Sequence, residues 1–216
     1  MHSHRRLGTG FAAVALGALL VVACQKQPEP AAQVPAAPAG PARGTREWKI
    51  QNAMSAAPTA IASAATLMEW GATPTAQPVQ LRAGTNGWTC FVDNPGTPGN
   101  DPMCFDAAFG AWATAWMGHK TPNITSFGVA YMLQGGTDAS NTDPFKMAPD
   151  SGHAWVDTGP HVMVVVPNVQ HLRGISTDPK NGGPYVMWSG TPYAHVMVPV
   201  AAAGATMSGM AGMAAR

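Results

Sequence analysis

Charge is scarce in this chain of 216 residues: only 11% of them are Asp, Glu, Lys or Arg, whereas a typical soluble protein has about a quarter. The formal net charge is +1. Such a chain has no strong electrostatic field to draw it to the phosphates of a nucleic acid or a membrane. We therefore expect no nucleic-acid partner.

Familiar catalytic motifs are also missing. The sequence has no GxSxG, HExxH, GxGxxG or Walker loop, and no CxxCH for haem. No glutamate follows Glu69, so acid catalysis beyond that residue would need aspartate or histidine, which disfavours a paired-carboxylate glycosidase. A Ser/His/Asp site assembled from distant segments stays open, because such triads are recognised by geometry.

The first residues have the pattern of an export signal. Met-His-Ser-His-Arg-Arg is a basic start, the run from Leu7 to Val22 is apolar, and Ala23 precedes Cys24. The segment Leu-Val-Val-Ala-Cys that ends at Cys24 resembles the lipobox of bacterial lipoproteins. This resemblance implies that residues 1–23 are a signal peptide and that Cys24 carries lipid. A secretory signal with a chance cysteine is the alternative.

The lipobox resemblance also implies a location. Gln25 follows Cys24, in place of the aspartate that retains many such lipoproteins in the inner membrane, so we expect the outer membrane, facing the periplasm or the cell surface. Two or three acyl chains suffice for stable anchoring. No later stretch approaches the roughly 20 apolar residues of a spanning helix, so the lipid is the expected membrane contact.

Three cysteines are present. If Cys24 is lipidated, Cys90 and Cys104 remain as a pair in an oxidising compartment, where a disulfide is the default state. The bond would close a loop rich in Pro, Gly and Asn. Two metal thiolates are the alternative, although the spacing without a CxxC is poor for zinc.

Composition divides the chain into segments. Residues 24–45 follow the signal and are rich in Pro and Ala, as expected for an extended tether. Residues 46–200 form the expected single globular domain, with seven basic and ten acidic side chains. Residues 201–216 are rich in Met, Ala and Gly and are expected to be a flexible tail.

Apolar periodicity predicts one amphipathic helix, capped by Asp106 and ending near His119. Its apolar stripe is Phe109, Trp112, Ala113, Trp116 and Met117. A shorter helix over residues 47–54 is a weaker prediction.

Strands are predicted more often than helices. Asn86-Gly87 predicts a hairpin between the segments 79–82 and 88–92. Because strands and helices do not alternate regularly, the expected fold is α+β, with a mostly antiparallel sheet of meanders and hairpins and the amphipathic helix packed on it. The predicted strands cover residues 66–70, 79–82, 88–92, 127–133, 154–157, 161–166, 185–188 and 193–198.

The most suggestive chemical pattern is a repeated His-x-Met. His161 and Met163 share one predicted strand, and His195 and Met197 share another. Residues i and i+2 of a strand lie on the same face, so neighbouring strands could bring four soft ligands together. Imidazole with thioether suits copper, particularly Cu(I). The alternative is ordinary core packing, with each imidazole hydrogen-bonded to a backbone carbonyl.

Two other ligand classes are weaker hypotheses. The segment 135–144 offers two carboxylates, an amide and hydroxyls, which are calcium ligands, but it lacks the EF-hand spacing and terminal glutamate; Asx and Ser/Thr turns are the alternative. Seven tryptophans are present against three tyrosines. Trp88, Trp155 and Trp188 could stack on a sugar or an apolar ligand, or could simply be buried.

The predicted domain also carries a broader resemblance. The segments 81–90, 131–144 and 183–195 resemble those of uncharacterised exported bacterial proteins, which implies no particular activity. We therefore expect a lipid-anchored cell-envelope protein that is a non-catalytic binding or scaffold module, with a possible copper site at the two His-x-Met pairs. The alternative is an envelope or extracellular hydrolase, in which His153, His161 or His195 is the general base and Asp157 or Asp143 its partner.

Overall fold

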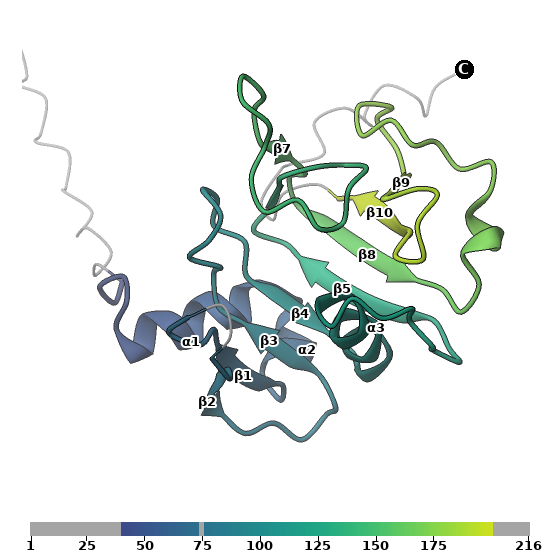
Figure 1. Cartoon of the computed structure of the whole chain (residues 1–216). Helices are drawn as coiled ribbons and strands as arrows, with labels where there is room; N and C mark the ends of the chain where they lie inside the picture. Colours follow the sequence, from purple (N-terminus) through teal and green to yellow (C-terminus); the bar gives the residue numbers. More distant parts are fainter. Residues whose placement is uncertain (1–39, 74–75, 201–216) are drawn as a thin grey trace, which may run out of the picture. The chain divides into compact units, whose positions relative to one another are not determined.

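The computed structural model describes residues 40–73 and 76–200. The predicted signal peptide, Cys24, most of the predicted tether and the predicted tail lie outside these residues. The fold is mixed α/β, and its large, mostly antiparallel sheet confirms that prediction (Figure 1). The helices are α1 (Arg46–Ser55), α2 (Thr59–Ala62), α3 (Ala107–Met117) and the short 3-10 helix η1 (Val169–Leu172).

Eight strands form the main sheet in the order β2-β1-β3-β4-β5-β8-β10-β9, and β6 and β7 pair separately. Each pairing is antiparallel except that of β1 with β3. The strands are β1 (Thr66–Glu69), β2 (Val79–Arg82), β3 (Thr89–Phe91), β4 (Met103–Phe105), β5 (Gly128–Met132), β6 (Thr137–Asp138), β7 (Val156–Asp157), β8 (His161–Val165), β9 (Tyr185–Met187) and β10 (His195–Pro199).

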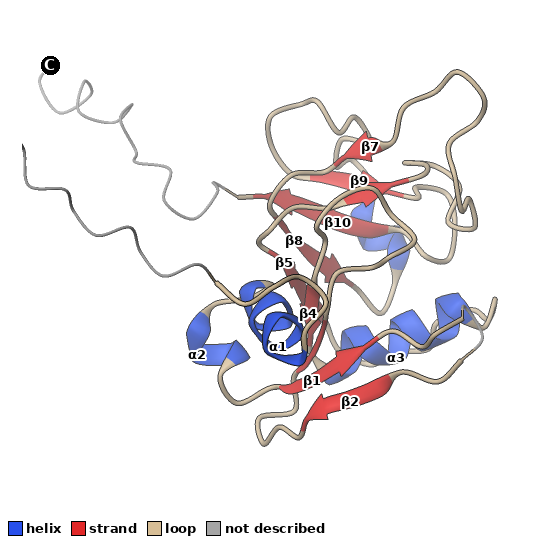
Figure 2. Cartoon of the chain, turned by 90° about the vertical axis from the view of Figure 1, so that its left-hand side faces the viewer, coloured by secondary structure: helices blue, strands red, loops and turns tan. Residues whose placement is uncertain are grey.

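The sheet buries side chains on both faces. Helices α1 and α2 lie on one side and α3 on the other (Figure 2). Leu67, Leu81 and the two cysteines belong to the core beneath α1 and α2. Phe109 and Trp112 of α3 belong to a second core with the side chains of β5, β8, β9 and β10. This second core contains Met163 and Met197, the two methionines of the predicted copper site.

The predicted hairpin between residues 79–82 and 88–92 is wrong. Strand β1 lies between β2 and β3, which do not pair. Asn86 does form a turn, since its Oδ1 accepts a hydrogen bond from the Trp88 amide (3.1 Å). The chain segment that connects β2 to β3, however, crosses the start of β1. There the Thr66 amide donates to the Trp88 carbonyl (2.9 Å) and the Thr85 amide donates to the Ala64 carbonyl (2.8 Å). These hydrogen bonds to β1 replace the expected β2–β3 pairing.

Cys90 and Cys104 form the predicted disulfide. They lie directly opposite each other on β3 and β4, and both are fully buried. Strand β4 itself was not predicted, because its three residues lie between turn formers and the start of α3. The disulfide therefore joins two neighbouring strands at the centre of the core beneath α1 and α2.

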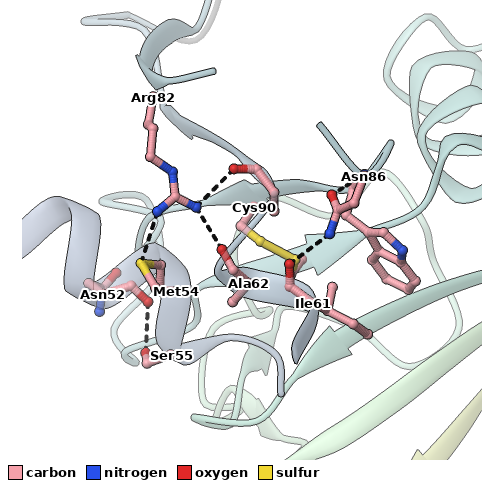
Figure 3. The surroundings of a disulfide bond; sticks show 11 residues. Asn52, Met54, Ser55, Ile61, Ala62, Arg82, Asn86 and Cys90 are labelled. Atoms are coloured by element: carbon pink, nitrogen blue, oxygen red, sulfur yellow. Dashed lines mark hydrogen bonds between the residues drawn. A yellow bond between two sulfur atoms is a disulfide. The ribbon is translucent and has the colours of Figure 1, made fainter. Parts of the chain in front are cut away.

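Polar side chains fasten α2 over the disulfide (Figure 3). The Arg82 guanidinium donates to the carbonyls of Ala62 (2.7 Å) and Ala65 (3.0 Å). Asn86 donates from Nδ2 to the Ile61 carbonyl (2.8 Å). The last carbonyls of a helix lack partners within the helix, so these donors satisfy groups that would otherwise be orphaned.

Helix α3 begins at the predicted cap. Asp106 accepts from the Phe109 amide (2.8 Å) through Oδ1 and from the Val129 amide (2.9 Å) through Oδ2, so one carboxylate ties the helix start to β5. Phe109, Trp112 and Ala113 are buried, as predicted. Met117 was expected on the buried stripe, but it is 59% exposed because the helix ends there. Nowhere in residues 40–73 and 76–200 is a helix both long and apolar enough to cross a membrane.

Candidate functional site

The two His-x-Met segments are neighbouring antiparallel strands. Met163 of β8 is directly opposite Met197 of β10, and directly opposite residues share a face. His161 and His195, each two residues away along its strand, therefore lie on that face too. All four side chains are buried. The face is the one that packs against α3 (Figure 1).

Two further methionines extend this arrangement. Met132 of β5 is directly opposite His161, and Met187 of β9 is directly opposite His195. The six residues form a continuous band across four strands, which we call the His/Met row: Met132, His161, Met163, Met197, His195 and Met187. Sequence analysis did not identify Met132 or Met187, because only the strand register places them beside a histidine.

The register brings the two central methionines together and places the histidines at the ends. His161 is opposite Pro199, and His195 precedes Pro199 by four residues on β10. At about 3.3 Å per residue, the two main-chain positions lie about 13 Å apart along the strands. Each histidine therefore has its own two methionine neighbours, one opposite and one on its own strand.

Both imidazoles are held in the same protonation state. His161 Nδ1 lies 2.7 Å from the Gly159 carbonyl oxygen, and His195 Nδ1 lies 3.0 Å from that of Tyr193. A carbonyl oxygen only accepts, so each Nδ1 donates. Burial lowers the pKa of both rings, that of His195 to about 4. Each neutral ring therefore keeps a lone pair on Nε2.

His161 Nε2 is buried and has no hydrogen-bond partner among the described residues. A buried nitrogen without a hydrogen-bond partner costs folding free energy, so its presence calls for an explanation such as a bound ion. A histidine that binds a metal typically donates its other ring N–H to a carbonyl or carboxylate. His161 has this arrangement already.

Glycine separates His161 from a surface cleft. A side-chain carbon added at Gly136 would lie 2.9 Å from Met132 Cε, 3.0 Å from Thr158 Oγ1 and 3.3 Å from His161 Cε1. Gly136 also lines a cleft of about 320 Å³, together with Gly135, Asn100, Asp157 and Pro160. Met132 and His161 thus both lie next to a glycine that lines the cleft.

Aromatic side chains enclose the other end of the row. The His195 ring makes edge-on contacts with Trp112 (5.2 Å between centroids) and Trp188 (5.0 Å). These two indoles are stacked at 6.1 Å. Trp112 belongs to α3, so the helix covers His195 with an aromatic layer.

Other buried polar atoms lie near the row's strands. Tyr185 is directly opposite Met197, and its hydroxyl has no hydrogen-bond partner in the described part of the chain, nor do Thr137 Oγ1 and Asn141 Oδ1. Burial, with a contribution from Asp138, raises the pKa of Tyr185 to about 12. The tyrosine therefore stays neutral and adds no charge to this face.

The predicted hydrolase residues are not assembled into a site. His153 and Asp157 are exposed, and no hydrogen bond links them in the described chain. Asp157 accepts from the Gly159 amide (2.9 Å) and Asp143 accepts from the Phe145 amide (2.9 Å). Because His161 Nδ1 is bonded to a backbone carbonyl, neither carboxylate orients this imidazole.

The segment proposed for calcium forms the alternative turns. Asp138 accepts from the Ser140 amide (2.9 Å), and Ser140 Oγ accepts from the Asp143 amide (2.9 Å). Within the described ranges, no three His, Cys, Asp or Glu side chains are grouped to hold a metal ion. The candidate centre described above instead combines single imidazoles with thioethers.

The tryptophans proposed for ligand stacking lie apart from one another. Trp188 is buried in the core beneath α3, whereas Trp88 packs against Tyr131 on the opposite face of the sheet (5.6 Å between centroids). Trp155 lies next to β7 and is half-buried. The three indoles therefore form no common platform.

The chain matches no protein-family model, no curated protein and no solved structure. The chemistry of the His/Met row is therefore the basis on which a function can be assigned.

Proposed function

We propose that this protein is a lipid-anchored, non-catalytic binding module of the cell envelope and that it binds Cu(I) at the His/Met row. The observation that carries the proposal is the buried, unpartnered Nε2 of His161. The strand neighbours of His161 on this face are Met132 and Met163, and His195 shares the face. The four residues predicted from the sequence, His161, Met163, His195 and Met197, are the centre of the proposed ligand set.

The chemistry of the row favours a soft, monovalent ion. Thioether and neutral imidazole are preferred ligands of Cu(I). The six residues include no carboxylate, so a bound divalent ion would carry an uncompensated double charge into the core, at a high desolvation cost. Cu(I) brings one charge. The α3 helix, which we regard as the predicted amphipathic helix, covers this face with Phe109 and Trp112.

Features of the sequence support the proposed outer-membrane location and the proposed non-catalytic role. The lipobox resemblance at Cys24 and the Pro/Ala-rich segment after it suit a domain tethered to the outer membrane. Within residues 40–73 and 76–200, no carboxylate is hydrogen-bonded to either histidine of the row, so the row lacks the His/Asp pair of the alternative hydrolase. A binding role in copper handling accounts for both features.

The anchoring proposal predicts that Cys24→Ser removes the protein from the outer membrane. The native chain should incorporate radiolabelled palmitate and sediment with the outer-membrane fraction, because two or three acyl chains anchor stably. The serine variant should take up no label and be lost from the outer-membrane fraction, because acylation and cleavage both require the cysteine. Equal labelling of both chains would contradict lipidation at Cys24.

The copper proposal predicts tight Cu(I) binding that depends on the two histidines. The full chain with Cys24→Ser, which removes a competing thiol, is titrated anaerobically with Cu(I) against a chromogenic chelator. Changing His161 and His195 together to Phe should weaken binding by at least about 100-fold, or about 3 kcal/mol. X-ray absorption should show sulfur in the copper shell of the parent.

Matched controls separate ligand loss from unfolding. Met163→Leu with Met197→Leu nearly preserves core volume and should also weaken binding. His171→Gln and Met147→Leu change exposed residues and should bind as the parent does. A parent chain that binds no Cu(I), or a folded double histidine variant with unchanged affinity, would refute the proposal.

A further inference from the structure

We infer that the His/Met row holds two Cu(I) ions: an outer one bound by His161, Met132 and Met163, and an inner one bound by His195, Met187 and Met197. This inference rests on the proposed function and adds to it the number of ions, two further ligands and a division between an accessible and an enclosed site.

The register supplies each histidine with two thioethers. Met132 is opposite His161 and Met187 is opposite His195, which places the paired Cα atoms about 5 Å apart. The second methionine of each set lies two residues along the same strand. Each end of the row therefore has one imidazole and two thioethers on a single face, without a ligand taken from the other end.

A single shared ion fits this geometry poorly. The main-chain positions of His161 and His195 are about 13 Å apart along the strands, whereas a metal–nitrogen bond is about 2 Å long. Moreover, each Nδ1 is bonded to the carbonyl two residues before it, which lies beyond the row and away from the Met163–Met197 pair. The two imidazole rings are therefore held at opposite ends of the His/Met row.

The surroundings of the two ends differ. His161 and Met132 lie next to Gly136, which lines the cleft, so the outer site is close to a surface opening. The His195 ring makes T-shaped contacts with Trp112 and Trp188. A cation bound there would lie close to indole rings, whose π-systems attract cations, and should change their fluorescence.

The two sites should also be unequal in affinity. Two Cu(I) ions on the same buried face of the sheet would each carry a positive charge, and like charges repel strongly where water does not screen them. Charge at one end of the row is therefore unfavourable for charge at the other. The first Cu(I) should weaken the binding of the second, so the titration should show two steps.

The test counts ions and locates them. The full chain carries Cys24→Ser, Met207→Leu, Met210→Leu and Met213→Leu, which remove one thiol and three thioethers outside the described residues. It should bind two equivalents of Cu(I), and tryptophan fluorescence should change with one of them. The outer variant, Met132→Leu with Met163→Leu, should bind one equivalent and keep the fluorescence change.

The inner variant, Met187→Leu with Met197→Leu, should bind one equivalent without the fluorescence change, and Met147→Leu should behave as the parent. One equivalent in the parent, abolished by either double variant, would overturn the two-ion inference while leaving copper binding intact. No equivalent in the parent, with far-UV circular dichroism showing a folded chain, would refute the proposed function itself.

Discussion

Gly84→Ala is expected to destabilise the domain by about 3 kcal/mol or more, as large steric clashes in a packed interior do. A Cβ at this position would lie 2.1 Å from the Thr66 nitrogen and 2.3 Å from the Ala65 carbonyl carbon. Both atoms are backbone, and the Thr66 amide is held by the Trp88 carbonyl. Neither chain can move without breaking the crossing of the β2–β3 connection over β1. Urea unfolding followed by circular dichroism measures the loss.

Gly183→Ala is the matched control. The nearest atom to a Cβ there is Asn181 Oδ1 at 3.8 Å, so the free energy of unfolding should change by no more than about 0.5 kcal/mol. If both alanine variants unfold at the same urea concentration, the crossing is not as tight as the backbone positions indicate.

Acidification of the metal-free protein is the second large effect. His195 has an ordinary pKa of about 6.5 when unfolded and about 4 when folded. Between these values the unfolded chain binds more protons, so stability falls as the pH falls from 6.5 to 4. The pKa shift of His195 changes the free energy of unfolding by about 3 kcal/mol over this whole pH range. The lowered pKa of His161 acts in the same direction. Urea unfolding at pH 7 and pH 4.5 measures it.

The control for this prediction removes one ionisable ring at a time. Burial raises the pKa of Asp101 and of Asp138, which opposes the histidine effect at acid pH, so the comparison is between variants and parent over the same range. His195→Phe should reduce the pH dependence, whereas His171→Gln, which changes an exposed ring, should leave it unaltered. A His195→Phe variant with the same pH dependence of stability as the parent would contradict the buried, neutral state of His195.

Local elements were predictable because each depends on neighbouring residues. Asp106 and the spacing of Phe109, Trp112 and Ala113 define α3 within a dozen positions, and the alternation in His161–Val165 defines β8. Pairing between strands depends on distant contacts. The Asn86-Gly87 turn is compatible with a hairpin. That β1 lies between β2 and β3 follows from the pairing of distant segments, which no local signal reveals.

The candidate site was predictable to the same extent. The i, i+2 rule placed His161 beside Met163 and His195 beside Met197 without knowledge of the fold. Met132 and Met187 have no such signal, because they become neighbours of the histidines only through the register of β5 with β8 and of β9 with β10. The burial that keeps the rings neutral also depends on α3, which is distant in sequence.

The Cys90–Cys104 bond has a consequence for the chain after proteolytic cleavage. It encloses a loop whose residues Pro95 and Gly96 are exposed. Exposed turn residues of this kind are preferred points of proteolytic nicking. A single cut there would not divide the molecule, because the fragment that begins the chain and the fragment that bears the His/Met row would remain one covalent unit. Nicked protein would migrate as intact material until it is reduced, and the row would stay attached to whatever holds the N-terminus.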